Sequence, residues 1–321
     1  MEKDALRWTT VTVDDVRPLS ELINHLAAVD DTDEIYSPED LAEELAVEGF
    51  TPELDTLAVW AGDDLVAYCF VSVRSHLDSD GLARGGCEGG VHPQWRGKGI
   101  GQRIFDWQEH RVRELAGVRH PGVASYLRVD GQQEGAHRRR ILQRRGYRLV
   151  RYFNELELPL TKVPETEADV RGGGTALRAP EQTDGEDVRL VHNLAFADHW
   201  GATSMDAGVW QSGLWGGRAL RLAHSTIVLD ADGAILSYVI VQQYEPREAY
   251  VCLVGTVPSA RGRGLARAAL LHTLRSLKSS GDFDKVDLGV DASSPTGATG
   301  LYEQLGFSLL RQTGMMRLDL G

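Results

Sequence analysis

The chain has 321 residues, about twice the length of a typical domain, so two domains are expected before any residue is read. Hydrophobic residues make up 42% and charged residues 25%, which excludes a disordered tail, a collagen-like repeat and a disulfide-rich scaffold. The formal net charge of −13 argues against binding of nucleic acid through bulk charge, so no nucleic-acid partner is predicted.

The cysteines and the distribution of apolar residues indicate the cellular setting. Cys69, Cys87 and Cys252 are odd in number and lack the close spacing of metal ligands, so neither a disulfide framework nor a metal site is predicted. The opening residues MEKDALRWTT contain no apolar signal segment, and no stretch of about 18 apolar residues occurs in the chain. We therefore expect a cytoplasmic protein without a membrane partner.

The first half begins with helical patterns and continues with a hairpin. Apolar spacing predicts a helix over Pro18–Val29. Ser37 followed by Pro38 predicts the start of another helix, because serine caps helices and proline suits their first turn. Residues 56–61 and 65–73 are rich in strand-forming side chains and flank a Gly-Asp-Asp turn, which is typical of a β-hairpin.

The second half follows a polar segment at 161–175 that contains a proline and a run of glycines, and this segment is predicted to be a linker. Residues 225–229 and 235–241 predict another hairpin. A strand, a helix and a strand are then expected at 249–256, 265–278 and 286–290. Both halves predict a mixed α/β fold of the α+β kind, in which a mostly antiparallel sheet is flanked by helices.

The two halves resemble each other at a shift of 160–165 residues. In each half a strand pattern ends in an arginine- and glycine-rich turn, at 94–101 and at 259–266, and a helical pattern follows. Each half closes on a glycine and an aromatic residue, Gly146-Tyr147 and Gly306-Phe307. The sequence therefore predicts two domains of one architecture, residues 1–160 and 176–321.

Both turns have the pattern Arg-x-x-Gly-x-Gly/Ala. Glycines let the backbone approach a ligand, while the following helix N-terminus presents unpaired N–H groups and a dipole that favours negative charge, so the turn suits a pyrophosphate. A dinucleotide fingerprint fails because Gln102 and Arg267 replace its third small residue, and a Walker loop fails because no lysine follows Gly99 or Gly264. The nearby positive side chains are Arg96, Lys98, Arg103, Arg261, Arg263 and Arg267.

Together with Leu301-Tyr302-Glu303-Gln304-Leu305-Gly306-Phe307, the two turns resemble the acetyl-CoA signatures of GNAT-superfamily N-acetyltransferases, including tandem two-domain members. The resemblance covers most of the chain as two copies. It implies acetyl-CoA as the cofactor, with pantetheine beside a splayed strand and the diphosphate on the turn. The implied cofactor-binding residues are Thr256, Val257, Arg261, Gly262, Arg263, Gly264, Leu265 and Ala266 in the second copy, and Val91, His92, Arg96, Gly97, Lys98, Gly99, Ile100 and Gly101 in the first.

The resemblance also implies a catalytic tyrosine at Tyr302, placed to protonate the leaving sulfur. The first copy has Leu142 at the matching position, and leucine has no proton to give, so the second domain is expected to be catalytic and the first degenerate. Glu248, just before the expected central strand, is the candidate general base, with Glu245 and His199 as alternatives. No cysteine precedes a plausible activating histidine, which favours direct transfer over an acyl-enzyme.

These observations predict an acetyl-CoA-dependent N-acetyltransferase that acts on a primary amine of a small molecule or peptide. Within this class, an amino-sugar thiol of the mycothiol-precursor type or an aminoglycoside-like amine is an alternative acceptor. A different class of protein, a non-catalytic acyl-CoA sensor or interaction protein, stays open because the first copy is degenerate.

Overall fold

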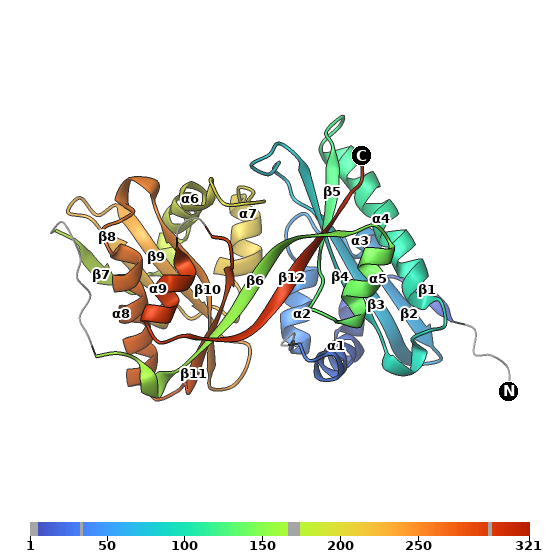
Figure 1. The fold of residues 1–321 in the computed structure, drawn as a ribbon, viewed down its shortest axis with the longest axis horizontal. Coiled ribbons are helices and arrows are strands. Elements are labelled where there is room, and N and C mark those ends of the chain that lie inside the picture. Colours follow the sequence, from blue (N-terminus) through green and yellow to red (C-terminus); the bar gives the residue numbers. More distant parts are fainter. Residues whose placement is uncertain (1–5, 33–34, 166–173, 295–296) are drawn as a thin grey trace. The chain divides into compact units, whose positions relative to one another are not determined.

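The computed structural model describes residues 6–32, 35–165, 174–294 and 297–321, and Figure 1 shows their fold. The chain divides into two compact units. The first unit comprises Met1–Gln132, Ala136–Leu149 and Met315–Gly321, and the second comprises Gln133–Gly135 and Val150–Gly314. Each unit therefore combines segments that are far apart in the sequence.

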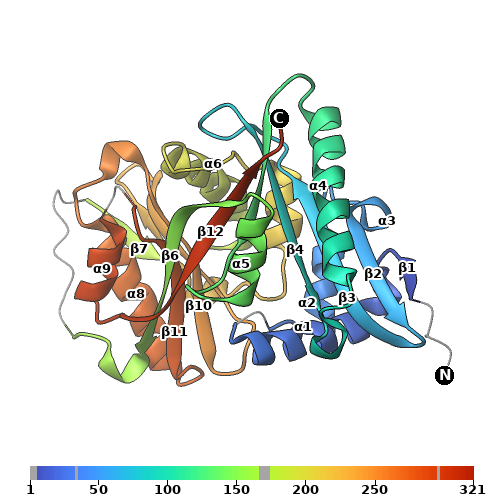
Figure 2. The same cartoon turned by 45° about the vertical axis from the view of Figure 1, so that its right-hand side comes forward.

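The first unit is a sheet between two layers of helices. Its strands are β1 (Arg7–Thr9), β2 (Thr56–Ala61), β3 (Asp64–Val73), β4 (Ala83–Val91), β5 (Ser125–Asp130) and the end of β12 (Ser308–Asp319), in that order across the sheet. Its helices are α1 (Val16–Asp30), α2 (Pro38–Leu45), α3 (Pro52–Asp55), α4 (Ile100–Arg119) and α5 (His137–Arg144). Apolar side chains of α4 and α5 pack on one face of the sheet and those of α1 and α2 on the other, and Figure 2 shows α4 lying along the strands.

The second unit repeats this arrangement. Its strands are β6 (Arg148–Pro159), β7 (Ala176–Arg178), β8 (Thr226–Leu229), β9 (Ile235–Gln242), β10 (Glu248–Thr256) and β11 (Lys285–Asp291), in the order β6-β11-β10-β9-β8-β7. Its helices are α6 (Gly185–Phe196), α7 (Ala207–Trp210), α8 (Leu265–Ser280) and α9 (Ala298–Gln304), and a π-helical turn spans Gln211–Trp215. Residues of α8 and α9 cover one face of the sheet, and residues of α6, α7 and the π turn cover the other.

The two copies exchange their last strands. Strand β6 belongs to the first half of the sequence but pairs with β11 of the second unit, from Phe153↔Asp291 to Pro159↔Lys285. The end of β12 pairs with β5 of the first unit, from Met315↔Asp130 to Asp319↔Tyr126. The unit boundaries therefore fall after Leu149 and Gly314 and do not coincide with the predicted domain boundaries at 160 and 175.

Local sequence signals account for several of these elements. The hydroxyl of Ser37 accepts a hydrogen bond from the Asp40 amide at 3.2 Å, with Pro38 in the first turn, as expected for the start of α2. Both predicted hairpins form, as β2–β3 and β8–β9. The fold class is confirmed, because antiparallel pairs predominate and only β4–β5 and β10–β11 are parallel among the described pairs. Residues 166–173 of the predicted linker lie outside the described residues.

Candidate functional site

The parallel strand pair of each unit separates before the glycine-rich turn. In the second unit, β10 and β11 pair from Glu248↔Lys285 to Tyr250↔Asp287, whereas β10 runs on to Thr256 beside β9. In the first unit, β4 and β5 pair only up to Gly86↔Arg128, although β4 continues to Val91. In the described residues, the second half of each central strand therefore lacks a partner on one side, and its outward backbone groups can bind a ligand.

The two glycine-rich turns have the same backbone geometry. Gly97 and Gly99 have φ of +74° and +86°, and Gly262 and Gly264 have φ of +74° and +80°. Gly99 and Gly264 are the N-caps of α4 and α8. A Cβ built on Gly97, Gly99 or Gly262 meets nothing within 4 Å, so the space above the turns is open. These turns fit a diphosphate, because unpaired helix amides face open space at the positive end of the dipole.

The predicted cofactor residues differ in what they offer. Ile100 and Leu265 are buried and anchor the two helices, so only their amides face the turn. In the second unit, the hydroxyl of Thr256 lies 2.9 Å from that of Ser237, and the Val257 amide donates to Leu236 O.

In the first unit, two predicted cofactor side chains contact aromatic rings of the protein. Lys98 Nζ lies 4.2 Å from the Trp95 ring centroid, and the His92 ring stacks on His25 at 4.9 Å. Gly101 and Ala266 continue the first turns of α4 and α8.

The two signature arginines bind carboxylates of their own unit. Arg261 contacts both oxygens of Asp198, at 2.5 and 3.0 Å, and donates to Ala195 O at 2.8 Å. Arg96 makes the equivalent bidentate contact with Asp30, at 2.9 and 2.7 Å. In both units the arginine thus ties the turn to the end of the first long helix, which is a positioning role. Arg263 also has a partner within the protein.

The first unit uses its outward strand carbonyls internally. The His92 amide bonds to Val66 O on β3, so by strand alternation the Gly89 and Val91 carbonyls point away from β3, into the separation from β5. Arg138 Nη2 donates to Gly89 O at 2.6 Å, and Arg96 Nε donates to Val91 O at 2.9 Å.

In the second unit the corresponding carbonyls belong to Val254 and Thr256, and in the described residues no side chain donates to them. Ala298 takes the place of Arg138 at the start of the helix. Of the two described strand edges, that of the second unit therefore leaves the carbonyls of Val254 and Thr256 available to a ligand, whereas the equivalent carbonyls of the first unit are occupied.

Tyr302 and Leu142 occupy equivalent positions at the ends of α9 and α5. The Phe307 amide bonds to Tyr302 O at 3.1 Å, and the Tyr147 amide bonds to Leu142 O at 3.0 Å. Tyr302 is 6% exposed, and its ring packs against Phe307 in the core under α8. Burial raises the pKa of Tyr302 to about 12, and the nearby Tyr250 phenol adds to this. The phenol is therefore protonated at neutral pH.

Three carboxylates of the second unit lie around one lysine. Lys285 Nζ lies 3.2 Å from Glu248, 3.1 Å from Glu157 and 3.3 Å from Asp287. Glu248, the base suggested by the sequence, is thus engaged in an ion pair, and its side chain is 40% exposed. Sequence reasoning missed Asp287, because an isolated aspartate inside a strand pattern carries no signal of burial.

Cys252 and Cys87 occupy the same position in the two repeats, near the point where the strands separate, and Cys252 lies at a bulge of β10. Burial raises the pKa of both thiols to about 12, which leaves a thiolate fraction on the order of 10⁻⁵ at pH 7. We expect Cys252→Ala to retain turnover within about twofold, since an unreactive thiol forms no acyl-enzyme. Steady-state kinetics beside Cys87→Ala check this, and loss of turnover in Cys252→Ala alone would establish a covalent route.

A buried polar pair beneath β10 was also missed from the sequence. His192 Nδ1 lies 2.7 Å from the Tyr238 hydroxyl, and burial lowers the pKa of His192 to about 4, so the ring is neutral. A Cβ on Gly255 would lie 2.5 Å from the Tyr238 ring. Gly255 is therefore required for the close approach of β10 to this pair, which supports the strand from the α6 side.

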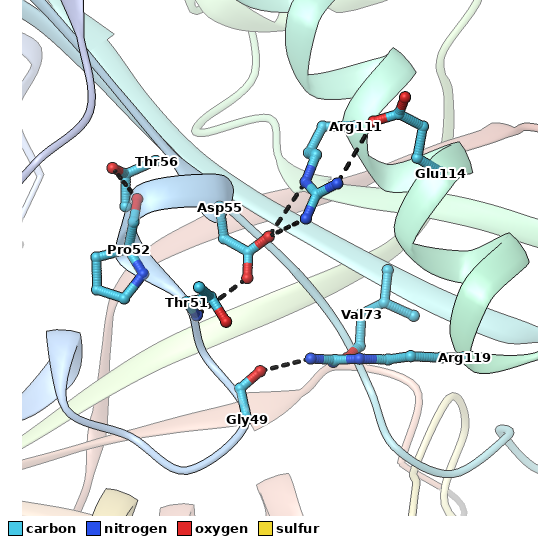
Figure 3. Close-up of polar contacts among 9 residues, drawn as sticks. All are labelled: Gly49, Thr51, Pro52, Asp55, Thr56, Val73, Arg111, Glu114 and Arg119. Atoms are coloured by element: carbon cyan, nitrogen blue, oxygen red, sulfur yellow. Dashed lines mark hydrogen bonds and ion pairs between the residues drawn. The ribbon is translucent and has the colours of Figure 1, made fainter.

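A groove on the first unit lies beside the middle of α4 and contains internal ion pairs. Arg111 lies 3.0 Å from Asp55 and 3.4 Å from Glu114, and Asp55 also accepts a hydrogen bond from the Thr51 amide. Figure 3 shows Arg111 between the two carboxylates. The groove is lined by Trp8, Thr9, Thr10, Glu53, Leu54, Thr56, Leu57, Trp107, Arg111 and Glu114. The Arg111 side chain pairs with both carboxylates and joins α3 to α4, which indicates a structural role.

Comparisons with known proteins agree with this geometry. The model of the Acetyltransferase (GNAT) family matches residues 187–307, which contain the second glycine turn and Tyr302. The chain is 31% identical over 268 residues to the mycothiol acetyltransferase of Salinispora arenicola (strain CNS-205), covering 78% of each protein. It is 30% identical over 250 residues to the mycothiol acetyltransferase of Salinispora tropica, covering 73% of each.

Solved structures share the fold. A GCN5-related N-acetyltransferase from Sphaerobacter thermophilus superposes with a TM-score of 0.73 at 20% identity, covering 100% of this chain and 97% of the other. A tandem GNAT protein from the clavulanic acid biosynthesis pathway superposes with a TM-score of 0.73 at 15% identity, covering 98% and 99%. None of the described helices has the length and apolarity needed to cross a membrane.

Proposed function

Because this chain belongs to the GNAT acetyltransferase family and is an acetyl-CoA-dependent N-acetyltransferase, we propose that its second unit transfers the acetyl group directly to a primary amine of a small molecule in the cytoplasm. One observation carries this assignment. The separated strands, a glycine turn at a helix N-terminus and a buried tyrosine occur together in the second unit, whereas Leu142 replaces the tyrosine in the first.

The residues of the second unit have separate roles in binding acetyl-CoA. The Gly262–Ala266 amides hold the diphosphate, and the free carbonyls of Val254 and Thr256 lie where pantetheine amides would pair. Arg261 positions the turn through Asp198. Acetyl-CoA supplies the acetyl group as a thioester, which an amine can attack without metal or redox chemistry.

Tyr302 acts on the leaving sulfur through its phenolic hydrogen. A phenol with a pKa of about 12 stabilises the developing thiolate by donating a hydrogen bond, and this interaction strengthens as charge develops. Glu248, the first residue of the central strand β10, is one candidate for the base.

The acceptor proposed first is the amine precursor of mycothiol, since the relatives are named mycothiol acetyltransferases. The test is incubation with acetyl-CoA and a panel that contains this amino-sugar thiol, an aminoglycoside-like amine and simple primary amines. Product mass and free coenzyme A are followed by mass spectrometry, because an acceptor thiol reacts with colorimetric thiol reagents. Formation of an amide with any amine supports the function, and selectivity for the precursor supports the acceptor. Absence of amide across the panel contradicts both.

We also expect the two cofactor positions to differ in affinity. The first-unit position at Val91, His92 and Gly97–Gly101 has the same turn geometry, but Arg138 and Arg96 occupy its strand carbonyls. Calorimetric titration with acetyl-CoA should give one tight site per chain. Arg138→Ala should add a second, weaker site, whereas Arg140→Ala on the exposed side of α5 should not. Two equal sites in the unmodified protein, or no gain in Arg138→Ala, would contradict this.

A further inference from the structure

A second carboxylate lies at the point where β10 and β11 separate. Tyr250↔Asp287 is the last registered pair between these strands. Val286 and Leu288 belong to the core under α8, so Asp287 points to the opposite face of the sheet, the one on which α6 and α7 pack. Asp287 therefore lies at the mouth of the strand separation, on the other face of the sheet from the core that holds Tyr302.

The two oxygens of Asp287 have different surroundings. Oδ2 lies 3.3 Å from Lys285 Nζ, which fixes the orientation of the carboxylate. Oδ1 is buried and has no hydrogen-bond partner in the described part of the chain. A buried acceptor without a donor is unfavourable, so a ligand that brought a donor to this carboxylate, whose side chain is 26% exposed, would be stabilised. An N–H of the acceptor amine is such a donor.

The charged surroundings of Asp287 come from three strands. Lys285 on β11 faces it, as do Glu248 and Tyr250 on β10 and Glu157 on β6. Burial raises the pKa of Asp287 to about 6 against the opposing effect of Lys285. A carboxylate with a pKa just below neutrality is ionised at pH 7 and is a stronger base than an ordinary aspartate, which suits proton abstraction.

We infer that Asp287 is the general base of acetyl transfer and that its partly exposed carboxylate takes the proton of the acceptor nitrogen. This inference rests on the proposed function of the second unit. The C–N bond forms and the thioester C–S bond breaks while one proton passes from nitrogen to Asp287. The departing sulfur keeps the hydrogen bond from Tyr302 and takes one proton from solvent as coenzyme A leaves, while Asp287 returns its proton to solvent. Amine and thioester thus become amide and thiol without another reactant.

The experiment compares Asp287→Asn with Glu248→Gln. Both carboxylates contact Lys285, so either variant removes one ion-pair partner of that lysine and controls for its loss. Asp287→Asn should lower kcat/KM by about 10²-fold, with acetyl-CoA affinity unchanged, and Asp287→Glu should restore part of the loss. In the unmodified enzyme kcat/KM should fall as the pH drops through about 6, because protonated Asp287 cannot accept the proton.

A second readout does not depend on turnover. Carboxyl ¹³C NMR of the free protein should show an aspartate that titrates near 6 and that disappears in Asp287→Asn. An active enzyme that loses rate in Glu248→Gln but not in Asp287→Asn would overturn the inference while leaving the proposed function intact. An unmodified protein that acetylates no amine would overturn both. An aspartate titrating near 6 that persists in Asp287→Asn would also contradict the assignment.

Discussion

Replacement of Tyr302 by phenylalanine is expected to lower kcat by about 10²-fold and to leave the affinity for acetyl-CoA nearly unchanged. The ring would still fill its place against Phe307, since only the hydroxyl is removed. The lost interaction is the hydrogen bond to the departing sulfur, which is stronger in the transition state than in the ground state. Steady-state kinetics with varied acetyl-CoA, together with calorimetric titration, separate the two effects.

Tyr147→Phe is the matched control for this substitution. Tyr147 is also buried and stands in the first unit at the position of Phe307, where its hydroxyl lies 3.2 Å from Glu109. Its replacement should not change turnover, because the first unit has no catalytic phenol in the site described. If Tyr302→Phe keeps full kcat, the sulfur draws its hydrogen bond from another donor. Equal losses in both variants would indicate an effect on folding.

Replacement of Met316 by alanine is expected to destabilise the first unit by about 2–5 kcal/mol, the usual effect of emptying a buried methionine site. Met316 is fully buried in the core beneath α4, although it is encoded after the whole second unit. It is held in β12 opposite Val129 of β5. Hydrogen exchange of the β5 amides, followed by mass spectrometry, measures the effect where it arises.

Met315→Ala provides the control, because neighbouring residues of a strand point to opposite faces. Met315 is only partly buried and pairs with Asp130, so its loss should cost less than about 1 kcal/mol. Faster exchange in β8 and β9 rather than in β5 of Met316→Ala would contradict the assignment of this strand end to the first unit.

Much of the fold follows from patterns that are local in the sequence. The start of α2 depends on Ser37 and Pro38, which act on the turn they belong to. The glycine turns depend on backbone conformations that glycine adopts readily, so the spacing of Gly97 and Gly99 predicts their geometry. The equivalence of Tyr302 and Leu142 follows from their shared distance to a glycine, at 306 and 146.

The remaining features depend on which segments meet in three dimensions. A local strand pattern does not say which strand it pairs with. The pairing of β6 with β11 and of the end of β12 with β5 therefore could not be read from the sequence. Asp198 binds Arg261 across 63 positions, and Asp287 gains its buried surroundings from β6 and β10, so neither was predictable from local spacing.

The strand exchange also sets the order in which the molecule can be completed during synthesis. The first unit needs Met315–Asp319, and a ribosome that adds about 5–20 residues per second needs about 10–40 s to travel from Asp130 to Met315. During that interval β5 presents an unpaired edge, which is a template for pairing with another chain. The first unit is therefore completed last, because its final strand, the end of β12, is synthesised only after the whole second unit.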